Sequence, residues 1–203
     1  YTELYRVDKS KEVGAKLRKA LEICKEKVYN PKDEMLDVFF DEKMNSIADI
    51  YSYGHDIEAS WLIDRACKVL EDKDLTDEFS KLTMIIADHS IEAAFENGAM
   101  NNQYCRGEID KTRVWWVQAE AIVGLINAYQ KSGEQKYLDT AVEIWKYIKE
   151  HLIDKREGSE WFSNLDENGE PTSKEPIVEP WKCPYHDGRM CMEVLKRYAD
   201  VHR

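Results

Sequence analysis

Long apolar runs and paired cysteine motifs are missing from this 203-residue sequence. No stretch approaches the roughly eighteen apolar residues of a transmembrane helix, and no charged-then-apolar leader opens the chain, so we expect neither a membrane span nor an export signal. The five cysteines are scattered without any Cys-x-x-Cys spacing, so the sequence predicts neither a zinc site nor a disulfide framework. Free thiols suit a reducing compartment, and we therefore predict a cytoplasmic location.

Motifs for cofactors are also missing, and positive charge is scarce. The sequence has no glycine-rich phosphate loop, no Gly-x-Ser-x-Gly motif and no metal-ligand pair at helical spacing, so we expect no cofactor and no metal. Lys and Arg number 29 against 40 Asp and Glu, which gives a net charge of −11. This charge would repel DNA, RNA and anionic membranes, so we expect none of them as a partner.

Apolar residues make up 43% of the sequence and aromatic residues 11%, which is enough for a sizeable core and unlike a disordered acidic segment. Apolar side chains recur every three or four residues in six segments, and this periodicity predicts helices. The predicted helices cover residues 11–28, a segment from Gly54 past Ala66, Thr76 or Asp77 to Glu96, 115–131, 135–151 and 188–201.

Two segments do not follow the helical periodicity. Residues 35–40 form a short apolar run that fits a strand or a hairpin arm. Residues 154–185 hold four of the five prolines and the pair Asn168-Gly169, so we predict a long ordered loop with a hairpin there. Successive helices with little strand signal indicate an all-α chain.

A weak internal sequence repeat supports stacked helical pairs. The segment HDIEA at 55–59 recurs as HSIEA at 89–93, thirty-four residues later. Thirty-odd residues for each helical pair fit a solenoid or an α/α toroid. The long aromatic loop favours the toroid, in which long loops surround a central pocket.

Candidate chemistry begins at His55. If a helix starts there, Glu58 and Trp61 follow on the same face. The positive end of the helix dipole disfavours an imidazolium, and a neutral imidazole is what a general base requires. An ordinary helix start with a solvated Glu and a core Trp explains the same spacing, so both interpretations stay open.

A second candidate surrounds His186, and a third surrounds Trp116. Pro180 and Pro184 stiffen the backbone on either side of Trp181, and His186 falls just before a predicted helix. Two histidines at helix starts suggest an acid–base pair, although Asp187 acting as a plain helix cap is an equal alternative. Trp116 and Glu120 share a helix face, as an aromatic platform beside a carboxylate does in sugar-binding sites; a core aromatic pair is the alternative.

These residues resemble the cellobiose 2-epimerases of the N-acylglucosamine 2-epimerase superfamily. The resemblance extends over essentially the whole chain and is carried, in order, by YGHDIEASWL at 53–62, VWWVQAEA at 114–121 and PWKCPYHDGRMC at 180–191. It implies an (α/α)6 barrel and reversible inversion at C2 of the reducing-end glucose of a β-1,4-linked disaccharide, through a cis-enediol.

The resemblance also assigns roles to residues. It implies that His55 and His186 are the two catalytic bases and that Glu58 assists beside the ring oxygen and His55. It further implies that Trp61, Trp116 and Trp181 stack on sugar, and that Glu120 binds a hydroxyl. A proton next to an aldehyde is weakly acidic, and inversion needs a base on each face, so the scheme is chemically sound.

The resemblance implies a barrel of about twice this length. We therefore expect residues 1–203 to be the C-terminal portion of one barrel domain, with residues 1–7 as the tail of a helix whose histidine-bearing start lies upstream. Three alternatives remain: an aldose–ketose isomerase on the same barrel, a half barrel that binds sugar without turnover, and a half barrel that self-associates or pairs with an N-terminal half.

Overall fold

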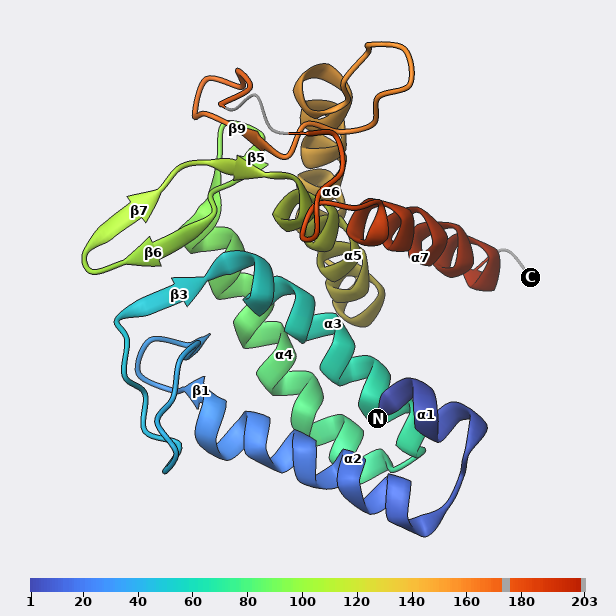
Figure 1. Ribbon diagram of the computed structural model, residues 1–203. Helices are drawn as coiled ribbons and strands as arrows, with labels where there is room; N and C mark the ends of the chain where they lie inside the picture. The colour runs from blue at the N-terminus through green and yellow to red at the C-terminus, as the bar shows by residue number, and fades with distance from the viewer. Residues whose placement is uncertain (173–175, 202–203) are drawn as a thin grey trace.

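The computed structural model describes residues 1–172 and 176–201 and shows helices in two layers (Figure 1). The helices are α1 (Thr2–Val7), α2 (Lys11–Ile23), α3 (Tyr53–Leu70), α4 (Lys73–Ala94), α5 (Trp115–Ser132), α6 (Gln135–Tyr147) and α7 (Tyr185–Val201). One layer holds α1, α3, α5 and α7, each packed on the next, while α2, α4 and α6 each pack on the helix that precedes them. This arrangement of helical pairs confirms the predicted all-α chain.

The predicted helix bounds need small corrections. The helices expected at 11–28 and 135–151 are present, but each ends in a wider π-helical turn, η1 (Cys24–Val28) and η2 (Ile148–Leu152). Helix α4 begins earlier than predicted, because the Asp72 side chain caps it by accepting from the Leu75 N–H at 3.1 Å. Helix α7 begins at Tyr185 rather than Gly188, so His186 lies within its first turn.

The sequence repeat at His55 and His89 does not correspond to a structural repeat. His55 lies in the first turn of α3, whereas His89 lies near the end of α4 and pairs with Glu34 at 3.5 Å. The helical pairs that this sequence repeat suggested are present, but the two repeated segments occupy different positions within them.

Helix α5 lies at the centre of the fold. It contacts α3, α6 and α7, and most of its side chains are buried, as its nearly continuous apolar sequence requires. A Cβ on Gly124 would lie 2.6 Å from Ile57 Cγ1 and 2.8 Å from the Ile57 carbonyl oxygen, so glycine allows α5 and α3 to approach. A smaller apolar cluster joins α2, α3 and α4 around Leu17 and Phe79.

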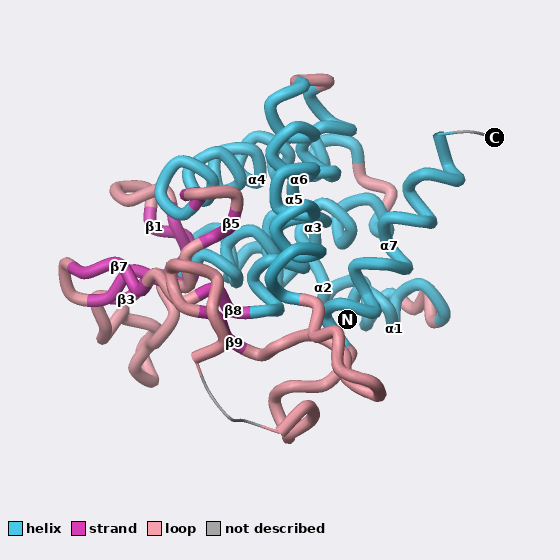
Figure 2. Tube along the Cα trace, turned by 90° about the horizontal axis from the view of Figure 1, so that it is seen from above, coloured by secondary structure: helices cyan, strands magenta, loops and turns pink. Residues whose placement is uncertain are grey.

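The sequence did not predict most of the short strands, which lie together at one side of the helices (Figure 2). They are β1 (Tyr29–Asn30), β2 (Met35–Leu36), β3 (Ile50–Ser52), β4 (Phe95–Glu96), β5 (Ala99–Met100), β6 (Gln103–Cys105), β7 (Glu108–Asp110), β8 (Arg113–Val114) and β9 (Asn164–Leu165). All pairings are antiparallel: β3-β6-β7 form a three-stranded sheet, and β1-β2, β4-β5 and β8-β9 form pairs. Strand β3 runs directly into α3, and β8 into α5.

The loop after α6 has the predicted hairpin. Leu165 forms an antiparallel bridge with Pro171, and Gly169 turns the chain with a φ of +85°. The pair β8-β9 holds this loop beside the start of α5, with Arg113 opposite Leu165 in the register. Residues from three distant parts of the chain therefore meet where α3, α5 and α7 begin.

Candidate active site

The first turns of α3, α5 and α7 bring both predicted histidines to one aromatic ring. His55 lies on α3, Trp116 on α5 and His186 on α7. The centroid of the Trp116 ring is 4.8 Å from that of His55 and 5.4 Å from that of His186. Each histidine lies in the first turn of its helix, where the backbone dipole disfavours an imidazolium.

Gly54 explains the position of Trp116. A Cβ at this glycine would lie 2.5 Å from ring atoms of Trp116 and 2.8 Å from Val117, so any larger residue would displace the ring. Because Gly54 immediately precedes His55, the same backbone segment positions the first histidine and leaves space for the ring between the two.

Each imidazole has one nitrogen held by the protein. His55 Nδ1 lies 2.8 Å from Ser52 Oγ, and His186 Nδ1 lies 2.8 Å from Glu120 Oε1. Within residues 1–172 and 176–201, neither Nε2 has a hydrogen-bond partner. Each ring therefore has one nitrogen free to take or give a proton.

Glu120 contacts three side chains of this site, Trp61, His186 and Arg189. It is fully buried; its Oε2 accepts from Trp61 Nε1 at 3.1 Å, and its Oε1 accepts from Arg189 Nη2 at 2.6 Å as well as pairing with His186. The same Arg189 nitrogen also donates to Glu58. Burial opposes the charge on Arg189, but Glu120 and Glu58 outweigh it and raise the pKa of the guanidinium.

The structure places the predicted site residues in different surroundings. Trp61 and Glu120 are both 0% exposed, and their contacts with a sugar stay a prediction. Glu58 pairs with Arg189 rather than with His55. Trp181 is 84% exposed, and its ring makes no aromatic contact with the described residues of the cluster. The structure brings His55 and His186 together at Trp116, and it joins His186 through one network to three further predicted residues, Glu58, Trp61 and Glu120.

Arg189 is the main residue that the sequence reasoning missed. It lies within the quoted motif, three residues after His186, and this helical spacing places both on one face of α7. Its guanidinium packs over the rings of Trp61, at 5.1 Å, and Tyr185, at 4.6 Å. Its Nη1 also donates to the Tyr185 hydroxyl at 2.7 Å. The spacing was a usable signal, but its acidic partners come from other helices.

Ligand atoms that could hold a metal do occur in this cluster. Oxygens of Glu58 and Glu120 and a nitrogen of His186 lie within 4.8 Å of one another. The Arg189 guanidinium already donates to both carboxylates, so an internal cation balances their charge. These carboxylates therefore fit an ion-pair network with an arginine better than a metal centre.

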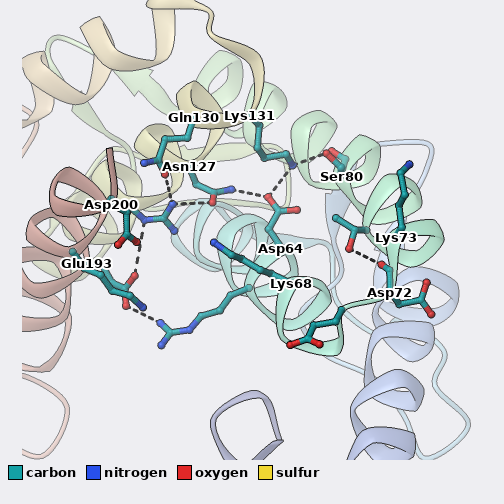
Figure 3. Close-up of a pocket in the computed structure, with 15 residues that line it drawn as sticks. Asp64, Lys68, Asp72, Lys73, Ser80, Asn127, Gln130, Lys131, Glu193 and Asp200 are labelled. Atoms are coloured by element: carbon teal, nitrogen blue, oxygen red, sulfur yellow. Dashed lines mark hydrogen bonds and ion pairs between the residues drawn. The ribbon is translucent and has the colours of Figure 1, made fainter. Parts of the chain in front are cut away.

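A second cluster of polar side chains lies at the other end of the same helices (Figure 3). A cleft of ≈ 670 Å³ is lined there by residues of α3, α4, α5 and α7, among them Asp64, Asn127, Lys131 and Arg197. Asp64 accepts from Thr83 at 2.8 Å, Asn127 at 2.6 Å and Lys131 at 2.8 Å. The residues lining this cleft include no histidine.

Comparison with known proteins shows which family this chain resembles. The profile of the family described as N-acylglucosamine 2-epimerase (GlcNAc 2-epimerase) matches residues 4–187. A cellobiose 2-epimerase from Ruminococcus albus is 52% identical over 201 residues, which are 99% of this chain and 52% of the relative. A cellobiose 2-epimerase from Dictyoglomus turgidum is 50% identical over 197 residues, 97% of this chain and 50% of the relative.

A solved structure shares the fold. The crystal structure of a sugar epimerase from a ruminal bacterium superimposes with a TM-score of 0.95 at 52% identity, covering 97% of this chain and 51% of that one. This match confirms the predicted α/α-barrel class. The chain spans about half the length of the relatives it matches.

Proposed function

The chain belongs to the N-acylglucosamine 2-epimerase family, and from that premise we propose that it forms the C-terminal half of a disaccharide 2-epimerase. The substrate would be a β-1,4-linked disaccharide such as cellobiose, whose reducing-end glucose is inverted at C2 to give glucosyl-mannose. Two relatives at 50–52% identity carry the name cellobiose 2-epimerase, which supports this substrate class.

The proposed reaction acts on the ring-opened aldose. One neutral histidine removes the C2 proton and becomes an imidazolium, the C–H electron pair becomes the C1–C2 double bond of a cis-enediol, and the carbonyl oxygen takes up a proton from solvent. The other histidine, protonated at Nε2, then gives this proton to the opposite face of C2, while the O1 proton leaves to solvent and C1 becomes an aldehyde again. His55 and His186 are the proposed bases, and Trp116 and Trp181 are proposed to contact the sugar rings.

One observation carries the proposal: both imidazoles lie against Trp116, and each is held through Nδ1. Proton transfer at two faces of one carbon requires two positioned imidazoles, one with a free lone pair that takes the C2 proton and one with a proton that it can give. Within the described part of the chain, no helix is long and apolar enough to cross a membrane. A cytoplasmic location remains a prediction.

Both edges of the helical row suggest that further helices complete the site. Met192 and Leu195 on α7 are 67% and 69% exposed, and on α1 at the other edge Leu4 and Val7 are 49% and 85% exposed. Exposed apolar helix faces at both edges are typical of interaction surfaces. We propose that they pack against the N-terminal half of a barrel.

The test combines complementation with isotope exchange. This chain is mixed with the N-terminal half of the Ruminococcus albus relative, cellobiose is added in deuterium oxide, and NMR follows deuterium at C2. The proposal expects exchange in the mixture, its loss in His186→Asn, and little change in Lys131→Met at the opposite end of the helices. Light scattering checks that the two halves form a complex.

Other outcomes would overturn parts of the proposal. A mixed complex that binds cellobiose without exchange would contradict catalysis and support a sugar-binding half barrel. Deuterium at C1 of a ketose product would instead support aldose–ketose isomerisation. A stable dimer of this chain that excludes the added half would contradict the proposed partner and support self-association.

A further inference from the structure

Arg189 contacts both carboxylates that group with the proposed base His186. Its Nη2 donates to Glu58 and to Glu120, and lies 3.4 Å from His186 Nδ1. Building on the proposed function, we propose that Arg189 is a positioning residue that keeps His186 a neutral base, with the proton on Nδ1 and the lone pair on Nε2.

The tautomer follows from the partners of Glu120. Both Trp61 Nε1–H and the Arg189 guanidinium are donors only, so the buried Glu120 carboxyl that receives them is an ionised acceptor. His186 Nδ1 lies 2.8 Å from this acceptor and therefore carries the hydrogen. A neutral ring with its proton on Nδ1 has its basic lone pair on Nε2, the nitrogen without a described partner.

The charge on His186 depends on several groups in four parts of the fold. Those that face it or lie beside it are Glu58 of α3, Glu120 of α5, and Tyr185, Asp187 and Arg189 of α7, while Glu160 and Lys182 of the preceding loop act on Asp187. Carboxylates favour an imidazolium, and Glu120 lies in direct contact with the ring.

Arg189 opposes this tendency in two ways. It shares the charge of Glu58 and Glu120, and its own positive charge close to Nδ1 repels a second positive charge on the ring. Its side chain is only 15% exposed, so water screens this repulsion weakly. Without the guanidinium, two carboxylates at a partly buried histidine would favour the imidazolium, which cannot accept the C2 proton.

The first test reads the tautomer in the unchanged chain. Histidine is labelled with ¹⁵N, the His186 signals are assigned from their loss in His186→Gln, and the ring nitrogen shifts are measured at pH 7 without sugar. The proposal expects a neutral ring protonated at Nδ1. A ring protonated at Nε2, or an imidazolium, would overturn it.

The second test reads the charge effect in three variants. In Arg189→Gln we expect the midpoint of the His186 titration to move up by about one pH unit or more, and in Arg189→Lys, which keeps the charge, by much less. Arg197→Gln is the matched control, because it removes the same charge from the same helix. The Arg197 guanidinium donates to Asn127 and Gln130 instead of to Glu58 and Glu120. A His186 midpoint that does not rise in Arg189→Gln, or that rises equally in Arg197→Gln, would overturn the proposal.

These measurements are independent of catalysis. Titration without sugar reports on Arg189 even in a chain that never epimerises, so failure of the proposed function and failure of this inference are distinguishable. If Arg189→Gln does not fold, the tautomer in the unchanged chain and the titration of Arg189→Lys still test the proposal. A large upward shift of the His186 midpoint in Arg189→Lys would contradict the claim that the positive charge at position 189 keeps His186 neutral.

Discussion

The two ends of α3, α5 and α7 use similar residues for different purposes. At the starts of these helices, Glu58, Glu120, His186 and Arg189 form a network around imidazoles with a free nitrogen. At the far ends, Asp64, Asn127, Lys131 and Arg197 form a network in which carboxylate and ammonium groups are paired with each other. Both are partly buried and held by three helices.

The two networks differ in the groups that they leave free. The cleft of ≈ 670 Å³ at the far end is lined by neither histidine nor cysteine. The histidine end keeps ring nitrogens without a described partner beside Trp116. Available proton acceptors therefore identify the histidine end as the candidate active site.

The largest expected effect is on catalysis at the histidine end. In the complemented enzyme, His186→Asn should lower epimerisation by about 10³-fold, since a positioned acid–base group contributes roughly 10²- to 10⁴-fold. Lys131→Met at the far end is the control and should stay within a few-fold of the unchanged protein. Rates are followed by NMR of the two epimers, and equal losses in the two variants would contradict the division between the ends.

The next largest effect is on stability at the far end. Asp64→Asn removes the charge that pairs with Lys131 and turns an amide toward the donors of Asn127 and Lys131, both largely buried. We expect the free energy of unfolding to fall by about 3 kcal/mol, as for other broken buried pairs. Urea unfolding followed by circular dichroism measures it, and a loss below about 0.5 kcal/mol would show that this network is not structural.

The sequence located the histidine end but did not predict the hydrogen bonds and ion pairs beneath the histidines. The motifs around His55, Trp116 and His186 identified side chains that meet in space. The network below them escaped prediction, because Arg189 joins Glu58 and Glu120 across 131 and 69 residues of sequence. No local spacing encodes contacts between helices that lie so far apart in the chain.

Burial and short strands were also beyond the local pattern. The position of Trp61 one turn after Glu58 fits either a sugar-stacking residue or a core residue, and the structure shows it fully buried under Glu120 of α5 and Arg189 of α7. Strands β3, β6 and β7 have three residues each, which is too short for an alternating apolar pattern to be recognised. The helices, with many turns each, were predicted with errors of a few residues at their ends.

A smaller effect is expected from two glycines in first turns at the histidine end. Gly54→Ala places a Cβ 2.5 Å from the Trp116 ring, whereas a Cβ at Gly188 would meet nothing within 4 Å. We expect Gly54→Ala to lose about 1–3 kcal/mol and to change tryptophan fluorescence, and Gly188→Ala to gain about 0.5–1 kcal/mol. Thermal unfolding distinguishes them, and equal stability of the two variants would refute the close contact at Trp116.

The smallest effect concerns Asp56, the counterpart of Asp64 on α3. Burial raises the pKa of Asp56 to about 8, and its Oδ2 has no hydrogen-bond partner among the described residues, while Oδ1 accepts from the Leu36 N–H at 2.9 Å. Because this native pKa lies above the ordinary Asp value of about 4, the folded protein holds an extra proton between those limits. Its contribution to stability is therefore full below about pH 4 and is lost as the pH rises to about 8.

Asp56→Asn should remove this loss of stability at rising pH, while its side-chain oxygen still accepts from the Leu36 N–H. We expect the variant to be more stable than the unchanged chain by about 1 kcal/mol or more at pH 8, and about equal to it at pH 4. Urea unfolding at both pH values measures the difference. A variant that is less stable at pH 8 would mean that Asp56, like Asp64, is satisfied as a carboxylate.

The central claim, that two histidines act on opposite faces of one carbon, is tested most directly by proton exchange in single-histidine variants. His55→Asn and His186→Asn, each complemented to a full barrel, are incubated separately with cellobiose and with glucosyl-mannose in deuterium oxide. The account predicts that neither variant interconverts the epimers, but that each still exchanges the C2 proton of one epimer, and of opposite epimers in the two variants. Exchange of the same epimer by both variants, or full interconversion by either one, would contradict it.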